Sequence, residues 1–379
     1  MLDINSIWQI IAPILVFLFG IGVANIICGY FNITLKRTIY LYLWHTLFCF
    51  LYAWYITKYG GDAIMYYSSS IHQNTSFAFG TEAVKYLTYF FSNVLRLSFL
   101  ATSLVYNIIG FIGLLAFDSA LSIAVLNKQK YIRKIATLII FLPSVSFWSS
   151  GIGKDSIAFM STGLALWAAL NFKRRVWMMV PAVMLMSIVR PHIAGILILS
   201  FAVSFIIQKR ISPILRFTFG AIAIIVSIIL VPIGLKYSSV DNKISSSELN
   251  KYINQRAKFN MEGGGSIDIS KMTLPIQIGT YLFRPFPFEA HSFPSFAASI
   301  DNLVLFYLFI LGIKSMIQKT YKSYKENRLF MWTYSLITLL ILSTTTANLG
   351  ISVRQKWIFT PMLIFLMISV IGNKKPLKR

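Results

Sequence analysis

The sequence predicts an all-α protein, a polytopic bundle of about eleven transmembrane helices with its N-terminus outside and its C-terminus in the cytoplasm. Three observations predict it. Of the 379 residues, 56% are hydrophobic and only 12% are charged, with a mean hydropathy of +0.69, whereas soluble domains carry about 25% charged residues. Apolar runs recur along the whole chain, and lysine and arginine concentrate in the short connectors between them.

A helix needs roughly 20 apolar residues to cross a bilayer, and eleven runs approach that length. They centre on residues 7–30, 38–57, 98–117, 135–149, 157–172, 176–189, 193–207, 217–235, 302–317, 330–346 and 357–372. The first run follows no basic segment and has no small-residue cleavage site, so we expect a retained helix. Because no repeat or separate soluble domain is evident, residues 1–379 are expected to form a single integral membrane domain.

The connectors alternate in charge, and this alternation predicts the orientation. Eleven spans place six basic connectors on one side, which the positive-inside rule makes cytoplasmic. These connectors hold Lys36, Arg37, Lys128, Lys130, Arg133, Lys134, Lys173, Arg174, Arg175, Lys209, Arg210, Arg216, Lys319, Lys322, Lys325, Arg328, Lys374, Lys375, Lys378 and Arg379. All acidic residues except Asp118 and Glu326 map to the opposite, outer face, which suggests that the protein works there.

Two outer segments are long. Residues 58–97 contain Asp62 and a stretch from Thr81 with the spacing of an amphipathic helix on the membrane surface. Residues 236–301 pass through three consecutive glycines, 263–265, that would act as a hinge, so this loop is a candidate lid.

The remaining composition excludes several classes. The net charge of +23 is explained by topology, so we expect no nucleic acid partner. Cys28 and Cys49 lie in apolar runs without a Cys/His pattern, so neither a disulfide framework nor a metal site is indicated. We expect no cofactor.

The segment from Pro143 to Ser156 (PSVSFWSSGIGKDS) places one cation and one carboxylate in a glycine turn between two apolar runs. Lys154 and Asp155 would open the fifth span, where unpaired backbone N–H groups and the positive end of the helix dipole favour an anion. The alternative is structural, with Asp155 or Ser156 capping the helix and Lys154 reaching the interface.

Three arginines repeat this pattern at the outer boundary. Arg190 precedes Pro191 and His192, Arg284 begins a segment RPFPFEAH that ends at His291, and Arg354 precedes the eleventh span. Inserting an arginine into the bilayer costs about 2.5–3.5 kcal/mol at a helix centre. An arginine without a function is therefore disfavoured there, which favours a functional role for Arg190. Structural interpretations also remain: the Arg284 segment as an interfacial belt, and His192, His291 and His45 as hydrogen-bonded structural residues.

Outward arginines and a lysine at a membrane interface suit a substrate with a pyrophosphate head and a lipid tail, since arginine binds phosphate bidentately. A transferase acting on such a donor also needs a base for the attacking hydroxyl, for which Asp62, Asp155 and Glu289 are the candidates. The arginines alone would stabilise the leaving group, so no metal is required.

These residues resemble those of a known family. PSxxFWSSGIGKDS at 143–156, Arg190-Pro-His and Arg284-Pro-Phe-Pro-Phe-Glu-Ala-His look like those of bacterial surface-polysaccharide polymerases for O-antigen and exopolysaccharide. The resemblance covers residues 135–300 and implies an undecaprenyl-pyrophosphate-linked glycan substrate at the periplasmic face. It implies substrate binding by Arg190, Arg284 and Arg354. Asp62 with Tyr66 and Tyr67 also resembles the acidic site of the C-superfamily glycosyltransferases, although those often have a paired acid.

The sequence therefore predicts a multi-pass glycosyltransferase of the bacterial inner membrane that polymerises lipid-linked repeat units. Expected substrate-binding residues are Lys154, Arg190, His192, Arg284, His291 and Arg354; expected catalytic residues are Asp155, Asp62 and Glu289. A chain-length regulator and other assembly proteins are expected partners, beside membrane lipid. Alternatives are single-sugar transfer from a polyprenyl phosphate, O-acyl transfer with a histidine base, or a flippase. Ionisable residues within the spans, few beyond His45 and Asp118, argue against the flippase.

Overall fold

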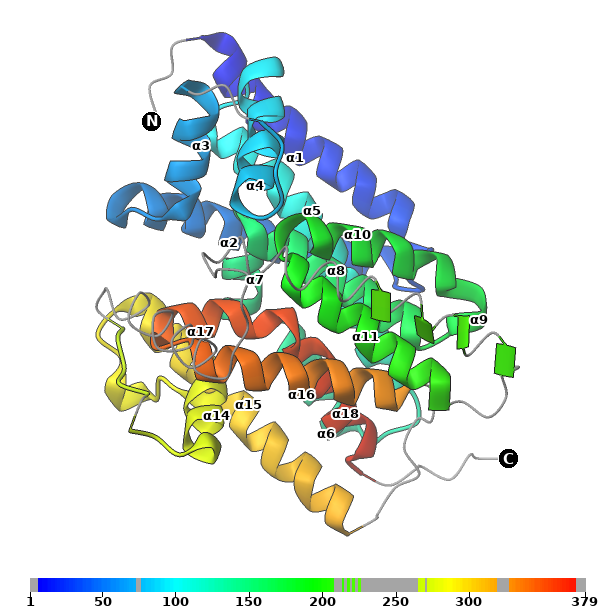
Figure 1. Cartoon of the computed structure of the whole chain (residues 1–379). Coiled ribbons are helices and arrows are strands. Elements are labelled where there is room, and N and C mark those ends of the chain that lie inside the picture. The colour runs from blue at the N-terminus through cyan, green and yellow to red at the C-terminus, as the bar shows by residue number, and fades with distance from the viewer. Residues whose placement is uncertain are drawn as a thin grey trace. The chain divides into compact units, whose positions relative to one another are not determined.

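The computed structural model describes residues 6–72, 76–207, 265–269, 271–318 and 327–372, with isolated positions between 213 and 225. The regular structure of these residues is helical, together with an isolated β-bridge between Ser266 and Asn348. The described helices form two compact units (Figure 1), which we call unit 1 (residues 1–123 and 140–190) and unit 2 (residues 124–139 and 191–379).

Unit 1 begins with two long helices and ends with shorter ones. Its helices are α1 (Ile7–Cys28), α2 (Leu35–Tyr59), α3 (Asp62–His72), α4 (Thr81–Tyr89), the π-helical η1 (Phe90–Val94), α5 (Phe99–Val125, whose end extends into unit 2), α7 (Pro143–Ser149), α8 (Lys154–Ala169), α9 (Phe172–Arg175), η2 (Val176–Met178) and α10 (Met179–Val189).

Unit 2 contains one short helix from the middle of the chain and the C-terminal helices. They are α6 (Lys130–Ile140), α11 (Pro191–Ile207), α14 (Leu274–Phe283), η3 (Pro287–Glu289), α15 (Phe293–Ile317), α16 (Arg328–Thr345), α17 (Leu349–Gln355), η4 (Lys356–Ile358) and α18 (Thr360–Val370).

Short polar residues, glycine and proline mark many helix boundaries. The Thr34 hydroxyl accepts a hydrogen bond from the Arg37 N–H at the start of α2, and Asn348 caps α17 in the same way. Gly60 ends α2 with a φ of 80°, a left-handed value that favours glycine. Pro143 and Pro191 open α7 and α11, where a missing N–H removes no helical hydrogen bond.

The chain is a multi-pass membrane protein by the length and hydropathy of its helices. Among the described residues, 6 helices are long and apolar enough to cross a membrane, or 7 if the pair Leu349–Ile358 and Thr360–Val370, bent by 67°, is one span. Three other predicted runs are helical, but their helices are shorter than these candidate spans; the runs are 157–172, 176–189 and 193–207. The run at 217–235 lies largely outside the described residues, so the count of eleven remains a prediction.

Close helix contacts and a partly buried ion pair hold unit 1 together. A Cβ on Gly113 of α5 would lie 2.6 Å from Met160 Cα, and one on Gly163 of α8 would lie 2.5 Å from Gly113 O, so only glycine permits this approach. α8 and α10 lie side by side (Figure 1). Arg37 donates to both carboxylate oxygens of Asp118, at 2.7 and 2.6 Å, which joins the start of α2 to α5.

Unit 2 is built around α18, whose residues from Thr360 to Val370 are all buried. α15 and α16 pack against it, and α11 packs against α16. Lys128 closes its C-terminal end, because the Nζ atom donates to the carbonyls of Ile368, Ser369 and Ile371 at 2.6, 2.8 and 2.7 Å. The last carbonyls of a helix lack partners one turn further on, so the ammonium group supplies a donor to each of these three; Ile368 O also accepts the Ile371 N–H at 3.3 Å.

The structure describes the first outer segment and only part of the second. The helix expected from Thr81 is present as α4, and residues 62–72 add α3. Of the candidate lid, residues 236–264 and 270 lie outside the described residues. Residues 265–269 follow, with Ile267 N–H donating to Ala347 O and Leu349 N–H donating to Gly265 O. Asp301, expected in this loop, is instead buried within α15.

Candidate functional site

The turn between α7 and α8 in unit 1 carries the first group of candidate residues. α7 ends at Ser149, and α8 begins at Lys154 after Gly153. A Cβ on Gly151 would lie 2.0 Å from Cε1 of Tyr52, so the turn lies directly against the ring and requires glycine there. The sequence predicted a glycine turn here, and the structure confirms it. Lys154 and Asp155 form the first turn of α8.

Arg190 binds Asp155 at the end of α10. The Arg190 Nη2 atom donates to Asp155 Oδ1 at 2.8 Å, and the two side chains are 9% and 11% exposed. Each of these buried charges stabilises the other, because either charge without its partner would be strongly destabilised by the loss of water. The Nε atom of Arg190 is buried without a hydrogen-bond partner among the described residues. The guanidinium thus has a donor left for an anionic ligand.

A buried polar network supports the same turn from behind. His45 Nδ1 lies 2.5 Å from Asn107 Oδ1, and His45 Nε2 lies 3.0 Å from Ser149 Oγ. Asn107 Nδ2 also donates to the Thr46 hydroxyl at 2.9 Å. His45 and Asn107 are fully buried, so His45 is a satisfied interior histidine, as the sequence predicted. The network joins α2 and α5 to the last residue of α7, immediately before the glycine turn.

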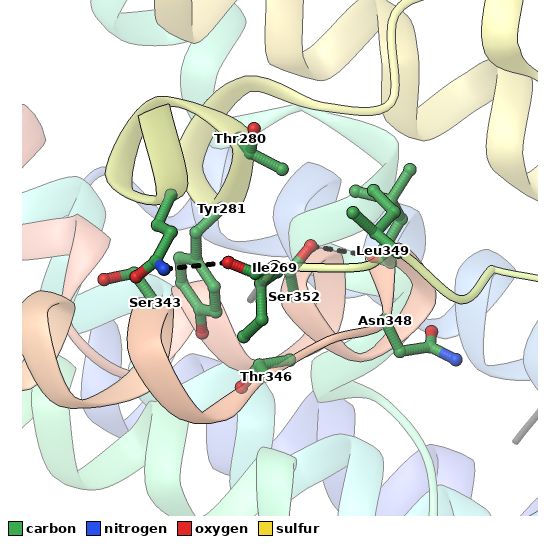
Figure 2. Close-up of a pocket in the computed structure, with 10 residues that line it drawn as sticks. Ile269, Thr280, Tyr281, Ser343, Thr346, Asn348, Leu349 and Ser352 are labelled. Carbon is green, nitrogen blue, oxygen red and sulfur yellow. Dashed lines mark hydrogen bonds between the residues drawn. The ribbon is translucent and has the colours of Figure 1, made fainter. Parts of the chain in front are cut away.

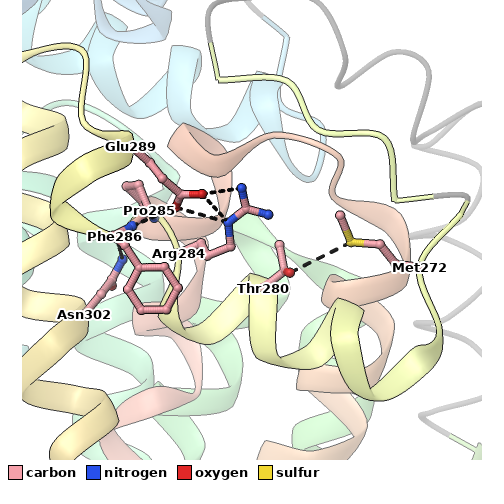
Figure 3. A network of polar contacts seen from close by, with 7 residues as sticks. All are labelled: Met272, Thr280, Arg284, Pro285, Phe286, Glu289 and Asn302. Atoms are coloured by element: carbon pink, nitrogen blue, oxygen red, sulfur yellow. Dashed lines mark hydrogen bonds and ion pairs between the residues drawn. The ribbon is translucent and has the colours of Figure 1, made fainter.

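In unit 2, Arg284 forms the second group with Glu289 (Figure 3). The Nε atom of Arg284 donates to both carboxylate oxygens at 2.9 and 3.1 Å, and Nη2 also donates to Oε1. The second oxygen accepts the Phe286 N–H at 2.8 Å. The side chains are 30% and 19% exposed. Arg284 is therefore oriented by a fixed carboxylate yet remains partly accessible to solvent.

The charges around Glu289 keep it ionised. Burial raises its pKa, but hydrogen bonds from Arg284 and from the Phe286 N–H, with the charges of Arg284 and His291, together lower the pKa below its usual value. His291 itself is exposed. A carboxylate with a lowered pKa is a weaker proton acceptor, so Glu289 is better suited to orienting Arg284 than to acting as a base.

Two buried residues hold the backbone on either side of Arg284. Asn302 of α15 donates to Pro285 O at 3.0 Å (Figure 3), and Lys356 donates to Leu282 O at 3.4 Å and to Asn302 Oδ1. Lys356 and Asn302 are fully buried. The main chain around Arg284 is thus fixed by α15 and η4, and its guanidinium by Glu289.

Sequence analysis missed this support. Asp301, which interacts electrostatically with Lys356, and Asn302 lie within a candidate span, as does Lys356 if α17, η4 and α18 form one bent span. The spans therefore contain more ionisable groups than the hydropathy pattern indicated. Glu289 five residues after Arg284 was a visible signal for the ion pair, but nothing near Lys356 in the sequence points to α15.

The remaining predicted residues lie on other helices. Asp62 is exposed and opens α3 in unit 1, after the Gly60–Gly61 turn. His192 lies in the first turn of α11 and Arg354 near the end of α17, both half-buried in unit 2. The structure thus brings Lys154 and Asp155 together with Arg190, and Arg284 together with Glu289 and His291. Within the described residues, no group of three or more His, Cys, Asp or Glu side chains has the arrangement of a metal site.

Unit 2 contains a small polar pocket whose lining includes Thr280 and Tyr281 of α14, the helix that ends just before Arg284 (Figure 2). Hydroxyl and amide side chains dominate its lining, with isoleucine and leucine completing it; the residues are Ile267, Ile269, Gln277, Thr280, Tyr281, Ser343, Thr346, Asn348, Leu349 and Ser352. Its volume of about 10 Å³ has room for about one water molecule. In this conformation the pocket is too small for a sugar.

No protein-family model, curated protein or solved structure matches this chain.

Proposed function

We propose that this protein is a membrane glycosyltransferase that joins lipid-linked oligosaccharide units at the outer face of a bacterial inner membrane, with an undecaprenyl-pyrophosphate glycan as substrate. The multi-pass architecture supports an amphiphilic substrate. The proposal also uses the resemblance of residues 143–156, 190–192 and 284–291 to polysaccharide polymerases.

The observation that carries the proposal is the arrangement around Arg284. Its guanidinium is oriented by Glu289, its flanking carbonyls are held by Asn302 and Lys356, and it is 30% exposed. Its Nη1 atom makes no hydrogen bond to the described residues. Such a preorganised arginine binds a phosphate without reorganisation, which favours stabilising charge that develops on a leaving pyrophosphate. In unit 1, Arg190 and Lys154 remain predicted phosphate ligands; the Arg190 side chain is 9% exposed, and its buried Nε atom has no partner among the described residues.

The proposed reaction is a displacement at an anomeric carbon. A sugar hydroxyl oxygen of one unit forms a bond to the anomeric carbon of another, while the bond from that carbon to the pyrophosphate oxygen breaks. The electron pair leaves with the lipid pyrophosphate, and a carboxylate accepts the hydroxyl proton. The predicted candidates for this carboxylate are Asp62, Asp155 and Glu289; Asp155 and Glu289 each bind an arginine, and Asp62 is exposed.

The test is the length distribution of lipid-linked glycans in a host strain lacking this protein, complemented by wild type, Arg284→Lys or Asp62→Asn. The deletion strain is expected to accumulate single repeat units, and Arg284→Lys is expected not to restore long chains. The same failure with Asp62→Asn would identify Asp62 as the base. Arg284→Lys keeps the charge but removes the bidentate geometry, so it tests the guanidinium itself.

Lys271→Gln is the matched control, because Lys271 is 87% exposed and its contact with Asp268 is 3.7 Å long. It should restore long chains, and all variants should reach wild-type levels in the membrane. If glycans of normal length form with Arg284→Lys present at the wild-type protein level, the proposed role of Arg284 is wrong. Units lacking one sugar in the deletion strain would favour single-sugar transfer.

A second candidate function is transport of a lipid-linked glycan. Asp301, Asn302 and Lys356 are fully buried within candidate spans, and α17 with η4 meets α18 at a bend of 67°. Buried charges beside broken helices are typical of transporters. In the same deletion strain, intact units accumulating on the cytoplasmic side would support transport and exclude the transferase.

A further inference from the structure

The helix α6 presents three different faces. Ile132, Ala136 and Ile139 are buried and attach the helix to the protein. A second face repeats every three or four residues and lines an open surface groove with the side chains of Lys130, Arg133, Lys134 and Thr137. We call this set the basic face of α6. Its spacing places all four residues on one stripe along the helix.

The cations of the basic face bind no carboxylate within the described part of the chain. The sequence contains no aspartate or glutamate between Asp118 and Asp155, so no local acid neutralises them. The neighbouring Lys128 differs, since its Nζ atom is used by three carbonyls at the end of α18. One lysine thus anchors this segment, and three cations point to the surface.

An exposed apolar strip borders the basic face. Tyr131 is 49% exposed and Leu138 is 51% exposed, and they lie two turns apart on the same side of α6. The helix therefore offers cationic and apolar groups side by side at its surface. α6 opens the candidate span Lys130–Ser149, and cationic and apolar groups at the end of a span lie where lipid head groups meet acyl chains.

We propose that the basic face of α6 binds the phosphate head groups of anionic phospholipids, with Tyr131 and Leu138 against the adjoining acyl chains. Charge complementarity selects an anionic ligand, and the apolar strip selects a lipid over a free phosphate. The sequence places this connector in the cytoplasm, where anionic lipid attracts basic segments. The inference does not depend on the proposed glycan chemistry.

The experiment uses the full chain in phosphatidylcholine nanodiscs that contain phosphatidylglycerol. The fraction of spin-labelled phosphatidylglycerol immobilised by the protein is compared with that of spin-labelled phosphatidylcholine. The wild-type protein should prefer phosphatidylglycerol. The variant K130Q/R133Q/K134Q should lose most of that preference, because each cation removed should lower the relative binding of phosphatidylglycerol by up to roughly 5-fold. High salt should weaken the wild-type preference because the contacts are exposed.

The control K271Q removes a cation that is 87% exposed in the predicted outer loop and should retain the preference for phosphatidylglycerol. A second variant, Y131S/L138S, removes the apolar strip and should reduce immobilisation of both lipids. Equal preference in the wild type and K130Q/R133Q/K134Q would overturn the proposal. Displacement of phosphatidylglycerol by millimolar inorganic pyrophosphate, without effect on phosphatidylcholine, would overturn it in favour of a site for free phosphate. Equal unfolding midpoints would confirm that all variants are folded.

Discussion

The two arginine–carboxylate pairs differ in their surroundings although they look alike in the sequence. The Arg190 and Asp155 side chains are 9% and 11% exposed, and the Arg190 Nη2 atom donates to Asp155 Oδ1 at 2.8 Å. Arg284 and Glu289 are 30% and 19% exposed, and Glu289 accepts several hydrogen bonds from Arg284 and one from the backbone. The first pair is buried, and the second is partly accessible and fixed by several hydrogen bonds to Glu289.

The difference separates stability from ligand binding. Breaking the buried pair leaves a charge in a poorly solvated site, whereas water reaches a charge left at the accessible pair. Conversely, a ligand reaches Arg284 without repacking, while Arg190 offers a buried Nε atom that only a closely fitting anion would contact. Variants of the Arg190–Asp155 pair should therefore change the free energy of unfolding, and variants of the Arg284–Glu289 pair should change activity more than stability.

The largest effect is expected for Asp155→Ala. It leaves Arg190 buried and unpaired, and removing one partner of a buried ion pair costs about 3–5 kcal/mol. The measurement is the free energy of unfolding from an SDS titration of the purified protein. The double variant Asp155→Leu/Arg190→Met removes both charges and should be less destabilised than Asp155→Ala. A single variant within 1 kcal/mol of wild type, an ordinary surface effect, would show that Arg190 is solvated.

The next largest effect is expected for His45→Ala, which leaves Asn107 and Ser149 without their ring contacts. An unsatisfied buried polar group costs about 1–3 kcal/mol. Because His45 and Asn107 touch, His45→Ala and Asn107→Ala should be non-additive, with a coupling of about 0.5–3 kcal/mol in a double-mutant cycle. Ser187→Ala, which removes only a hydroxyl bound to the Val183 carbonyl, is the control. Simple additivity would mean that the network does not act as one unit.

The sequence predicted the helices and turns that depend on residues close together in the chain. Apolar runs, proline and glycine marked α1, α2, α5 and the start of α11 well, because hydropathy and turn residues act over a few positions. The glycine turn before Lys154 and the segment around Arg284 were found for the same reason. The functional prediction that rests on them remains a prediction.

Contacts between segments far apart in the chain could not be predicted from the sequence. Asp155 and Arg190 were each singled out, but 35 positions separate them, and no local pattern shows that they bind each other. Lys356 lies 54 positions from Asn302, and Lys128 lies 240 positions from Ile368. Such contacts depend on how helices pack. The short helices α8 and α10 show the same limit, since hydropathy alone does not decide whether they cross a membrane.

A smaller loss of stability is expected for Arg284→Lys. The pair is partly exposed, and such pairs contribute about 0–1 kcal/mol, so the SDS unfolding free energy should fall by about 1 kcal/mol or less. The ratio between its stability effect and that of Asp155→Ala is the direct test of the comparison. If Arg284→Lys destabilises the protein as strongly as Asp155→Ala, the Arg284 pair is structural and the proposed separation of roles is wrong.

The smallest effect is expected from Glu289 and depends on pH. Its pKa is lowered from the usual 4.5, so in acid the unfolded chain binds a proton before the native state does. The stability that the native ion pair provides is complete above pH 4.5, and it is lost as the pH falls from there through the lower native pKa.

Glu289→Gln removes this titration, so its unfolding free energy should decrease less between pH 6 and pH 3 than that of the wild type. Identical profiles for Glu289→Gln and wild type would mean that Arg284 does not stabilise the Glu289 carboxylate, and the accessible pair would then lose its assigned role of orienting the guanidinium.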